Sequence, residues 1–376
     1  MGLLRSLLAL SVVIYHARPG STLLVGGPNA VRCFYVISGF LISYVLVERR
    51  QYASVRSFYL SRYLRLYPIY VVVALLALAA ALLMHQEHFL AVYRDSPPSA
   101  IAVLVLTNLF LIGQDWIMFL GVQHHALVPV ANFNHSDVAL YQGMLIHPAW
   151  TLGIELSFYA IAPFVLPRRK LIYALLLGSL LLRWYLVHLG LGTRDPWSYR
   201  FFPTELALFL AGALAQQWLL PWFAARDAAH RGIWSLAGTL ALIALCALYY
   251  ELSLPSHLAV FVLMGAFIAL VPLAFLFQRR HEFDVKLGEL SYPIYIVHWL
   301  VLSVTGHVLR RLGVLAPWVW ILVVLLTTIA AAMVLNKLVG EPFERLRVRL
   351  RGAGSPDPRR RWRGSIPLAP VEAGRG

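Results

Sequence analysis

Long apolar runs recur along the whole chain and alternate with short polar stretches. A helix needs about 20 predominantly apolar residues to cross a lipid bilayer, and inside the bilayer its backbone polar groups must be satisfied within the helix. Hydrophobic residues make up 60% of the chain, which excludes an ordinary soluble domain. The pattern therefore predicts an all-α polytopic membrane protein.

The charge pattern predicts ten transmembrane helices and one half-inserted or interfacial helix. The basic segment 48–65 should be cytoplasmic, whereas the loop 114–148 holds no Lys or Arg and should lie outside. The chain between them must then cross once, which leaves 100–113 as the half-inserted helix. Both termini are expected in the cytoplasm. The spanning runs are expected at 3–16, 30–47, 68–84, 149–166, 171–189, 202–220, 233–250, 257–277, 287–309 and 317–339.

Two parts are expected, an integral-membrane domain over 1–345 and a basic, disordered cytoplasmic tail over 346–376 that is rich in Pro, Gly and Arg. The formal net charge of +15 arises from Arg and Lys at the ends of the apolar runs and in the tail, so it indicates topology and no nucleic-acid partner. The opening run lacks a basic leader and a cleavage site, so we expect a retained helix. His85, His88, His124 and His125 lack the spacing of a zinc site, so no metal is expected.

Two ionisable side chains share one face of the opening run. His16 follows Arg5 by eleven positions, which is three helical turns plus about 20°, so they lie about 16 Å apart along one face. Ionisable groups inside an apolar helix are costly and indicate function. The alternative is that Arg5 snorkels to the interface and His16 hydrogen-bonds to a neighbouring helix.

An acidic residue lies near the start of the run 149–166. The helix should enter from outside near Trp150, which puts Glu155 about 8 Å below the surface and at a depth similar to that of His16. A pair between them would fix the imidazole tautomer and raise its basicity. A structural ion pair between helices is the alternative.

Other polar groups add candidates with structural alternatives. Arg62 and Arg65 lie one turn apart and, with Arg5, would form a cationic mouth for phosphates, although interfacial anchoring also explains them. Ser38 precedes a Gly that also suits helix packing. Ser291, Tyr295 and His298 share a helix face, where interhelical hydrogen bonding is an equal alternative. A polar vestibule is a weaker prediction, formed by Arg183, His188, Arg194, Asp195, Trp197, Arg200 and Glu205.

Together these stretches resemble the acyltransferase-3 family of integral-membrane acyltransferases. The resemblance runs in order over about 3–345, and departs from the family pattern at Arg32, where an acidic residue is usual, and at Thr151 and Leu156. These departures bear on which molecule accepts the acyl group more than on the transfer reaction itself. No esterase-like domain is expected after the last helix. The matching motifs are Arg5 with His16, FYVISGFL with Ser38, Arg62 with Arg65, WTLGIELSFY with Trp150 and Glu155, SYPIYIVH with Tyr292, Tyr295 and His298, and Glu341-Pro342.

The resemblance implies an O-acyltransferase, expected to be an O-acetyltransferase, of the bacterial inner membrane. It would move an acyl group from cytoplasmic acyl-CoA, expected to be acetyl-CoA, to a hydroxyl of a cell-surface or exported glycan or a lipid-linked saccharide, with no other cofactor. An acyltransferase for a lipid or an antibiotic, or a glycolipid transporter or flippase, is the alternative, and the lack of a visible inverted repeat counts against a carrier.

The resemblance also implies roles for the candidate residues. The three arginines, Arg5, Arg62 and Arg65, would hold the CoA phosphates. His16 would deprotonate the acceptor or carry the acyl group, and Glu155 would orient it. Substrate-binding residues are expected at Ser38, Trp150, Tyr292, Tyr295 and His298.

Overall fold

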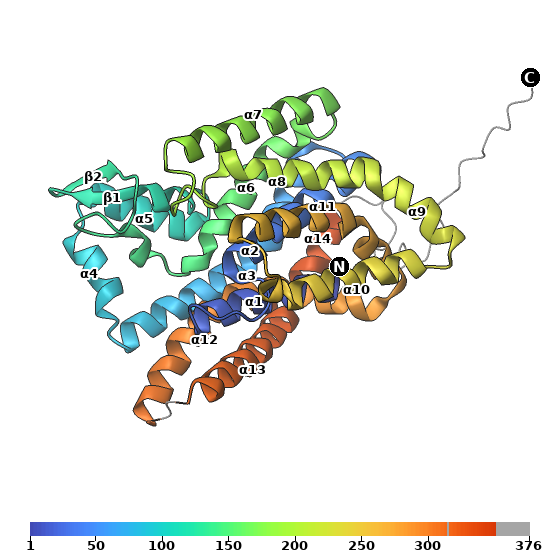
Figure 1. Cartoon of the computed structure of the whole chain (residues 1–376). Helices are drawn as coiled ribbons and strands as arrows, with labels where there is room; N and C mark the ends of the chain where they lie inside the picture. Colours follow the sequence, from blue (N-terminus) through green and yellow to red (C-terminus); the bar gives the residue numbers. More distant parts are fainter. Residues whose placement is uncertain (314–315, 351–376) are drawn as a thin grey trace, which may run out of the picture.

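The computed structural model describes residues 1–313 and 316–350, and the described chain is a bundle of helices with one small hairpin (Figure 1). The hairpin pairs β1 (Leu120–Gln123) with β2 (Ala126–Pro129) in antiparallel register. It belongs to the long loop 114–148. The prediction of an all-α membrane fold is confirmed.

The helices follow the predicted apolar runs closely. The α-helices are α1 (Gly2–Ala17), α2 (Gly27–Ser43), α3 (Val55–Leu83), α4 (Glu87–Asp95), α5 (Pro98–Phe110), α6 (Trp150–Val165), α7 (Arg169–His188), α8 (Phe202–Leu214), α9 (Leu220–Ala229), α10 (Ile233–Ala247), α11 (Ser256–Arg280), α12 (Glu282–Arg311), α13 (Pro317–Leu335) and α14 (Glu341–Leu350). π-Helical turns η1 (Tyr44–Glu48), η5 (Ala215–Leu219) and η7 (Asn336–Gly340) extend α2, α8 and α13. Short 3₁₀ turns are η2 (Trp116–Phe119), η3 (Leu140–Gly143), η4 (His147–Ala149) and η6 (Tyr249–Glu251).

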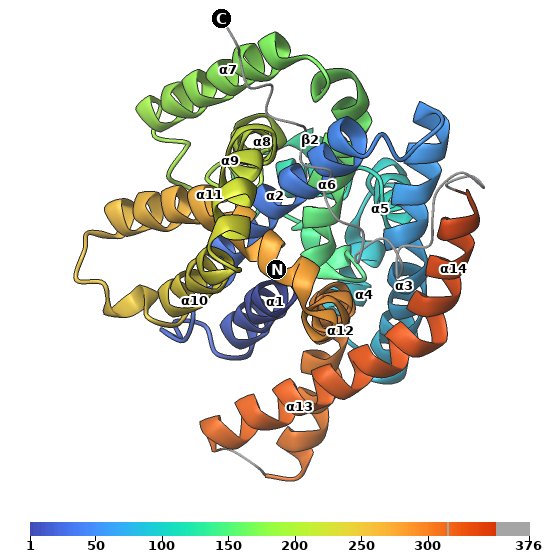
Figure 2. The same cartoon turned by 90° about the vertical axis from the view of Figure 1, so that its right-hand side faces the viewer.

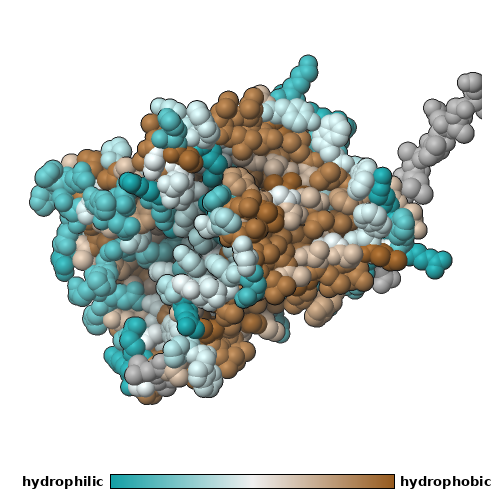
Figure 3. Space-filling model, viewed as in Figure 1, coloured by the Kyte–Doolittle hydropathy of each residue, from teal (hydrophilic) through white to brown (hydrophobic). Residues whose placement is uncertain are grey.

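Within the described residues, seven helices are long and apolar enough to cross a membrane: Gly27–Glu48, Val55–Leu83, Arg169–His188, Phe202–Ala229, Ser256–Arg280, Glu282–Arg311 and Pro317–Arg349. The apolar helices Gly2–Ala17, Pro98–Phe110 and Ile233–Ala247 are shorter. Apolar side chains cover the middle of the molecular surface, and polar ones gather over the end formed by α4, α5 and the hairpin (Figure 3). The chain is therefore a multi-pass membrane protein, while ten crossings with cytoplasmic termini stay a prediction.

Two boundaries differ in detail from the sequence predictions. Most of the basic segment 48–65 lies inside α3, whose start at Val55 is capped by reciprocal bonds between Ser54 and Ser57. At the other end, α14 continues to Leu350, so 346–350, expected in the disordered tail, are helical. The rest of the predicted tail lies outside the described residues.

Close glycine contacts bring α2 and α8 together near the middle of the bundle. A Cβ atom on Gly39 would collide with the carbonyl oxygen of Phe209, and one on Gly212 with the carbonyl oxygen of Val36. Small residues let helix backbones approach closely in membranes, where van der Waals packing replaces the hydrophobic driving force. The Gly39 next to Ser38 therefore does have a packing role, as the structural alternative for this motif required.

A second close pair joins α1 to α12. The backbone N–H groups of Gly2 and Leu3 donate to the carboxylate of Asp284, and the hydroxyl of Ser6 donates to the carbonyl of Leu287, 2.7 Å away. Seen along the bundle, α1, α2 and α12 lie near its centre, with α7, α10 and α13 towards its outside (Figure 2). The helix that carries Arg5 and His16 is thus central.

The α2–α8 contact gives a stability prediction. Gly212→Ala places a methyl group where the backbone of α2 already lies, so the helices must separate, at a cost of about 1–3 kcal/mol for an overpacked site. We expect a lower apparent melting temperature in detergent. Gly178→Ala in α7 is the matched control, because nothing lies within 4 Å of its Cβ position. Equal melting temperatures for the two variants would contradict the packing argument.

Candidate active site

Two cavities follow one another along α2. The first, here called the arginine cavity, has a volume of about 290 Å³ and is lined by side chains that include Arg5, Ser38, Arg62, Arg65 and Glu155. The second, the histidine cavity, has a volume of about 160 Å³, and its lining includes His16, His147, Trp150, Arg200 and Trp299. The lining residues run from Gly27 of α2 in the histidine cavity to Val45 of η1 in the arginine cavity. At 1.5 Å per residue this is about 27 Å, close to the thickness of a bilayer core.

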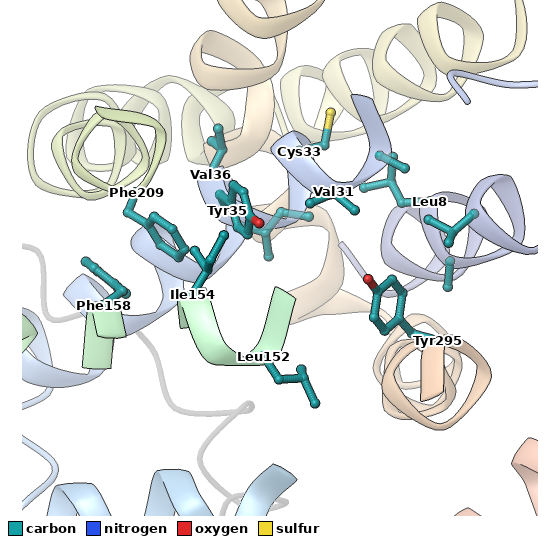
Figure 4. Packing of buried hydrophobic residues seen from close by; sticks show 14 of the residues in the cluster. Leu8, Val31, Cys33, Tyr35, Val36, Leu152, Ile154, Phe158, Phe209 and Tyr295 are labelled. Atoms are coloured by element: carbon teal, nitrogen blue, oxygen red, sulfur yellow. The ribbon is translucent and has the colours of Figure 1, made fainter. Parts of the chain in front are cut away.

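Val31 and Tyr295 line both cavities and form the wall between them. Tyr295 points from α12 towards α2 and α6, and Val31 lies across from it on α2 (Figure 4). The Tyr295 hydroxyl is held by Thr151, whose Oγ1 lies 2.9 Å away, and by the carbonyl of Pro148. One layer of side chains therefore separates the cavity that holds Arg5 from the cavity that holds His16.

The arginines meet as the sequence predicted, since Arg5, Arg62 and Arg65 all line the arginine cavity. Arg62 is 6% exposed, and its Nη2 donates to the Tyr52 hydroxyl over 2.6 Å. Its guanidinium carbon also lies 5.6 Å from the centre of the Phe58 ring. Among the described residues its buried Nε has no hydrogen-bond partner, so a donor is left for a ligand.

Glu155 lies in the arginine cavity and does not pair with His16, so the predicted pair is wrong. Its Oε1 accepts hydrogen bonds from the Ser38 hydroxyl, at 2.9 Å, and from the Tyr159 hydroxyl. The reason is depth: Trp150, at the start of α6, is level with His16, and Glu155 lies five residues further on, about 8 Å deeper. The carboxylate therefore shares a cavity with the cations.

His16 instead contacts His298 of α12. His16 Nδ1 lies 3.0 Å from the Val12 carbonyl oxygen and 3.2 Å from His298 Nε2. The indole of Trp299 packs edge-on against the His16 ring, with 5.6 Å between ring centres. The imidazole is thus fixed from two helices while it lines the histidine cavity.

The remaining wall of the histidine cavity is aromatic and cationic. Arg200 is held by Asp195 through two hydrogen bonds, of 2.6 and 2.9 Å, and its guanidinium carbon lies 4.3 Å from the centre of the Trp150 ring. The predicted vestibule is partly right, since Arg200 lines a cavity, whereas Glu205 is fully buried and pairs with Arg183. The sequence analysis missed lining residues that carry no charge or motif signal, namely Phe133, Tyr141, His147, Tyr199 and Trp299.

The other predicted residues divide between the two cavities. Ser291 and Tyr292 line the arginine cavity, and the Tyr292 hydroxyl donates to the carbonyl of Leu66, 2.5 Å away. Trp150 lines the histidine cavity. Arg32, where the family usually has an acidic residue, donates to the carbonyl of Ser198 in the connection between α7 and α8. The replacement of the usual acidic residue by Arg32 therefore affects a contact between α2 and the α7–α8 connection.

These features define a multi-pass membrane protein in which a cationic cavity and a histidine-bearing cavity meet in the bundle. A family model described as an acyltransferase domain matches residues 1–337. The chain therefore belongs to the acyltransferase-3 family.

Distant relatives of the chain carry the name O-acetyltransferase. The chain is 26% identical over 353 residues to the peptidoglycan O-acetyltransferase OatA of Listeria monocytogenes, a match that covers 84% of this chain and 51% of that protein. It is 25% identical over 166 residues to the O-acetyltransferase OatA of Staphylococcus aureus strain NCTC 8325 and to a putative O-acetyltransferase of strain COL, over 43% of this chain and 24% of each relative. The chain thus matches about half the length of the Listeria relative. No solved structure matches it.

A buried carboxylate behind α6 also escaped the sequence analysis. Asp115, in the loop after α5, is 3% exposed and packs against Gly153 so closely that a Cβ there would collide with it. Its Oδ1 has no hydrogen-bond partner among the described residues. Burial raises the pKa of Asp115 to about 6, against the backbone N–H groups of Asp115 and Trp116, which lower it.

This carboxyl gives a pH prediction. Because its folded pKa lies above the ordinary 3.8, the folded state binds more protons, so stability falls as the pH rises from about 4 to about 6 and stays lower above that. The free energy of unfolding is lower above this pH range than below it by at most about 3 kcal/mol. Asp115→Asn removes the ionisable carboxyl. We therefore expect the variant to have a higher melting temperature than the wild type at pH 7.5 and a similar one at pH 4.5. An equal gain at both pH values would contradict the assignment.

Proposed function

We propose that this protein is an O-acetyltransferase of the bacterial inner membrane, which moves an acetyl group from cytoplasmic acetyl-CoA to a hydroxyl of a cell-surface or exported glycan. The observation that carries the proposal is the pair of cavities, one with three arginines and one with His16, that meet at a single layer of side chains. Ten membrane crossings with cytoplasmic termini belong to the same proposal, and place the arginine cavity towards the cytoplasm.

The arginine cavity suits a phosphate-bearing donor. Arginine presents a planar fork of donors that matches phosphate oxygens, and Arg62 keeps a buried Nε available. Arg49 and Gln51, from the connection that follows η1, also line this cavity, so it reaches the end of the bundle near the start of α3. Apolar side chains such as Leu41 and Phe275 line it too, as the extended pantetheine arm of CoA requires. The thioester would then lie near Tyr295.

The histidine cavity suits a saccharide. Ligand sites combine apolar and aromatic walls with a few placed polar groups, and here Trp150, Tyr199 and Trp299 supply rings while Arg200 supplies a charge. The names of the relatives support a glycan acceptor, since the Listeria protein is named a peptidoglycan O-acetyltransferase.

In the proposed reaction His16 acts as a general base. Its unprotonated ring nitrogen takes the proton of the acceptor hydroxyl while the oxygen attacks the thioester carbonyl carbon. The C–O bond forms, the C–S bond breaks, and the CoA thiolate leaves with the proton that His16 had taken. No other reactant is needed. Glu155 lies with the arginines and is assigned to the donor side.

The test is a transfer assay with purified protein in lipid vesicles, acetyl-CoA and soluble glycan fragments, in which free CoA and O-acetylated sugar are both measured. We expect His16→Gln to lower kcat by 10²-fold or more, the contribution of a general base. Arg65→Gln should instead raise the KM for acetyl-CoA, most strongly at low salt, because the lost phosphate contact is electrostatic and salt screens it.

Arg94→Gln in α4 is the matched control for the arginine variant, because its side chain is 65% exposed and lies outside both cavities. Failure of the wild type to release CoA would overturn the enzyme proposal. CoA release with acetyl transfer to a lipid and none to glycans would overturn the acceptor class alone.

A further inference from the structure

The contact between His16 and His298 fixes which nitrogen of His16 is basic. His298 is fully buried, and its Nδ1 lies 2.6 Å from the carbonyl oxygen of Tyr295. A carbonyl oxygen has no hydrogen, so His298 Nδ1 carries the proton and donates. His298 Nε2 is then an acceptor in the neutral ring.

The same reasoning applies to His16. Its Nδ1 faces the Val12 carbonyl oxygen at 3.0 Å and His298 Nε2 at 3.2 Å. The carbonyl can only accept, so His16 Nδ1 is the donor, and its proton is shared with the lone pair of His298 Nε2. Two donors would face each other if His298 were protonated at both nitrogens. The remaining nitrogen of His16, Nε2, must carry the lone pair.

We infer that His298 is a positioning residue, which holds His16 in the Nδ1–H tautomer and stabilises its imidazolium during acyl transfer; this rests on the proposed function. When Nε2 takes the acceptor proton, the hydrogen bond from His16 Nδ1 to His298 becomes charge-assisted and stronger. The positive charge of the His16 imidazolium is then stabilised through His298 and the Tyr295 carbonyl, with no carboxylate in the hydrogen-bond chain. His298 therefore fills the orienting place that the sequence analysis gave to Glu155.

Tyr295 both holds His298 in place and separates the two cavities. The backbone carbonyl of Tyr295 accepts the hydrogen bond from His298 Nδ1, and its side chain forms part of the wall between the cavities. One turn of α12 therefore both orients the basic nitrogen of His16, through His298, and separates the acyl donor from the acyl acceptor. Packing of Trp299 on His16 adds a steric restraint.

The test compares two replacements of His298. His298→Gln keeps an acceptor oxygen for His16 Nδ1, whereas His298→Leu fills a similar volume without one. We expect His298→Leu to lower kcat by about 10- to 100-fold, the usual contribution of a partner that orients a histidine, with KM for both substrates unchanged. His298→Gln should recover most of the loss. Melting temperatures of both variants serve as the folding control.

Wild-type kcat in His298→Leu, or an equal loss of kcat in both variants, would overturn the positioning role. These outcomes differ from failure of the proposed function, in which the wild type itself releases no CoA. A second measurement needs no activity: ¹⁵N spectra of ring-labelled histidines, with His16→Gln used for assignment, should show His16 protonated at Nδ1. Protonation of His16 at Nε2 alone would also overturn the inference.

Discussion

The structure depends on one constraint: each charged or strongly polar side chain inside the bundle must find a partner there, because lipid offers none. Arg62 meets Tyr52, Glu155 meets Ser38 and Tyr159, and Arg200 meets Asp195. These contacts hold the polar side chains between the helices instead of against lipid. The two cavities therefore gather polar side chains within an otherwise apolar bundle.

The helix α2 organises both cavities. The contacts at Gly39 and Gly212 hold α2 against α8, while Val31 and Ser38 of α2 line the cavities. Because one helix lines both cavities, the distance between the arginines and His16 is set by helix geometry rather than by a flexible loop. A rigid spacing suits a donor whose phosphate groups and reacting thioester are far apart, as the proposed acyl-CoA is.

Much of the fold was predictable from the sequence, because apolar length and charge at the helix ends reflect the bilayer directly. The clustering of Arg5, Arg62 and Arg65 was predictable for a similar reason, since each has a defined level along its helix. The same arithmetic failed for Glu155. Depth along α6 was estimated from the membrane surface, whereas its neighbours are decided by how α6 packs against α2 and α3.

The partner of His16 was not predictable for a related reason. Periodicity placed His298 on one helix face with Ser291 and Tyr295, but no pattern shows which helix that face meets. The contact between α1 and α12 depends on tertiary packing. Trp299 likewise lines the site without a signal that the sequence analysis had used.

In the proposed reaction the thioester of the donor lies at the wall between the two cavities. The most direct measurement is photocrosslinking with an acyl-CoA analogue that carries a diazirine at its acyl end, followed by mass spectrometry of the labelled residues. We expect labels at Val31, Phe34 and Tyr295 that excess acetyl-CoA suppresses. Labels confined to lipid-facing positions such as Leu177 and Phe261, unaffected by acetyl-CoA, would contradict it.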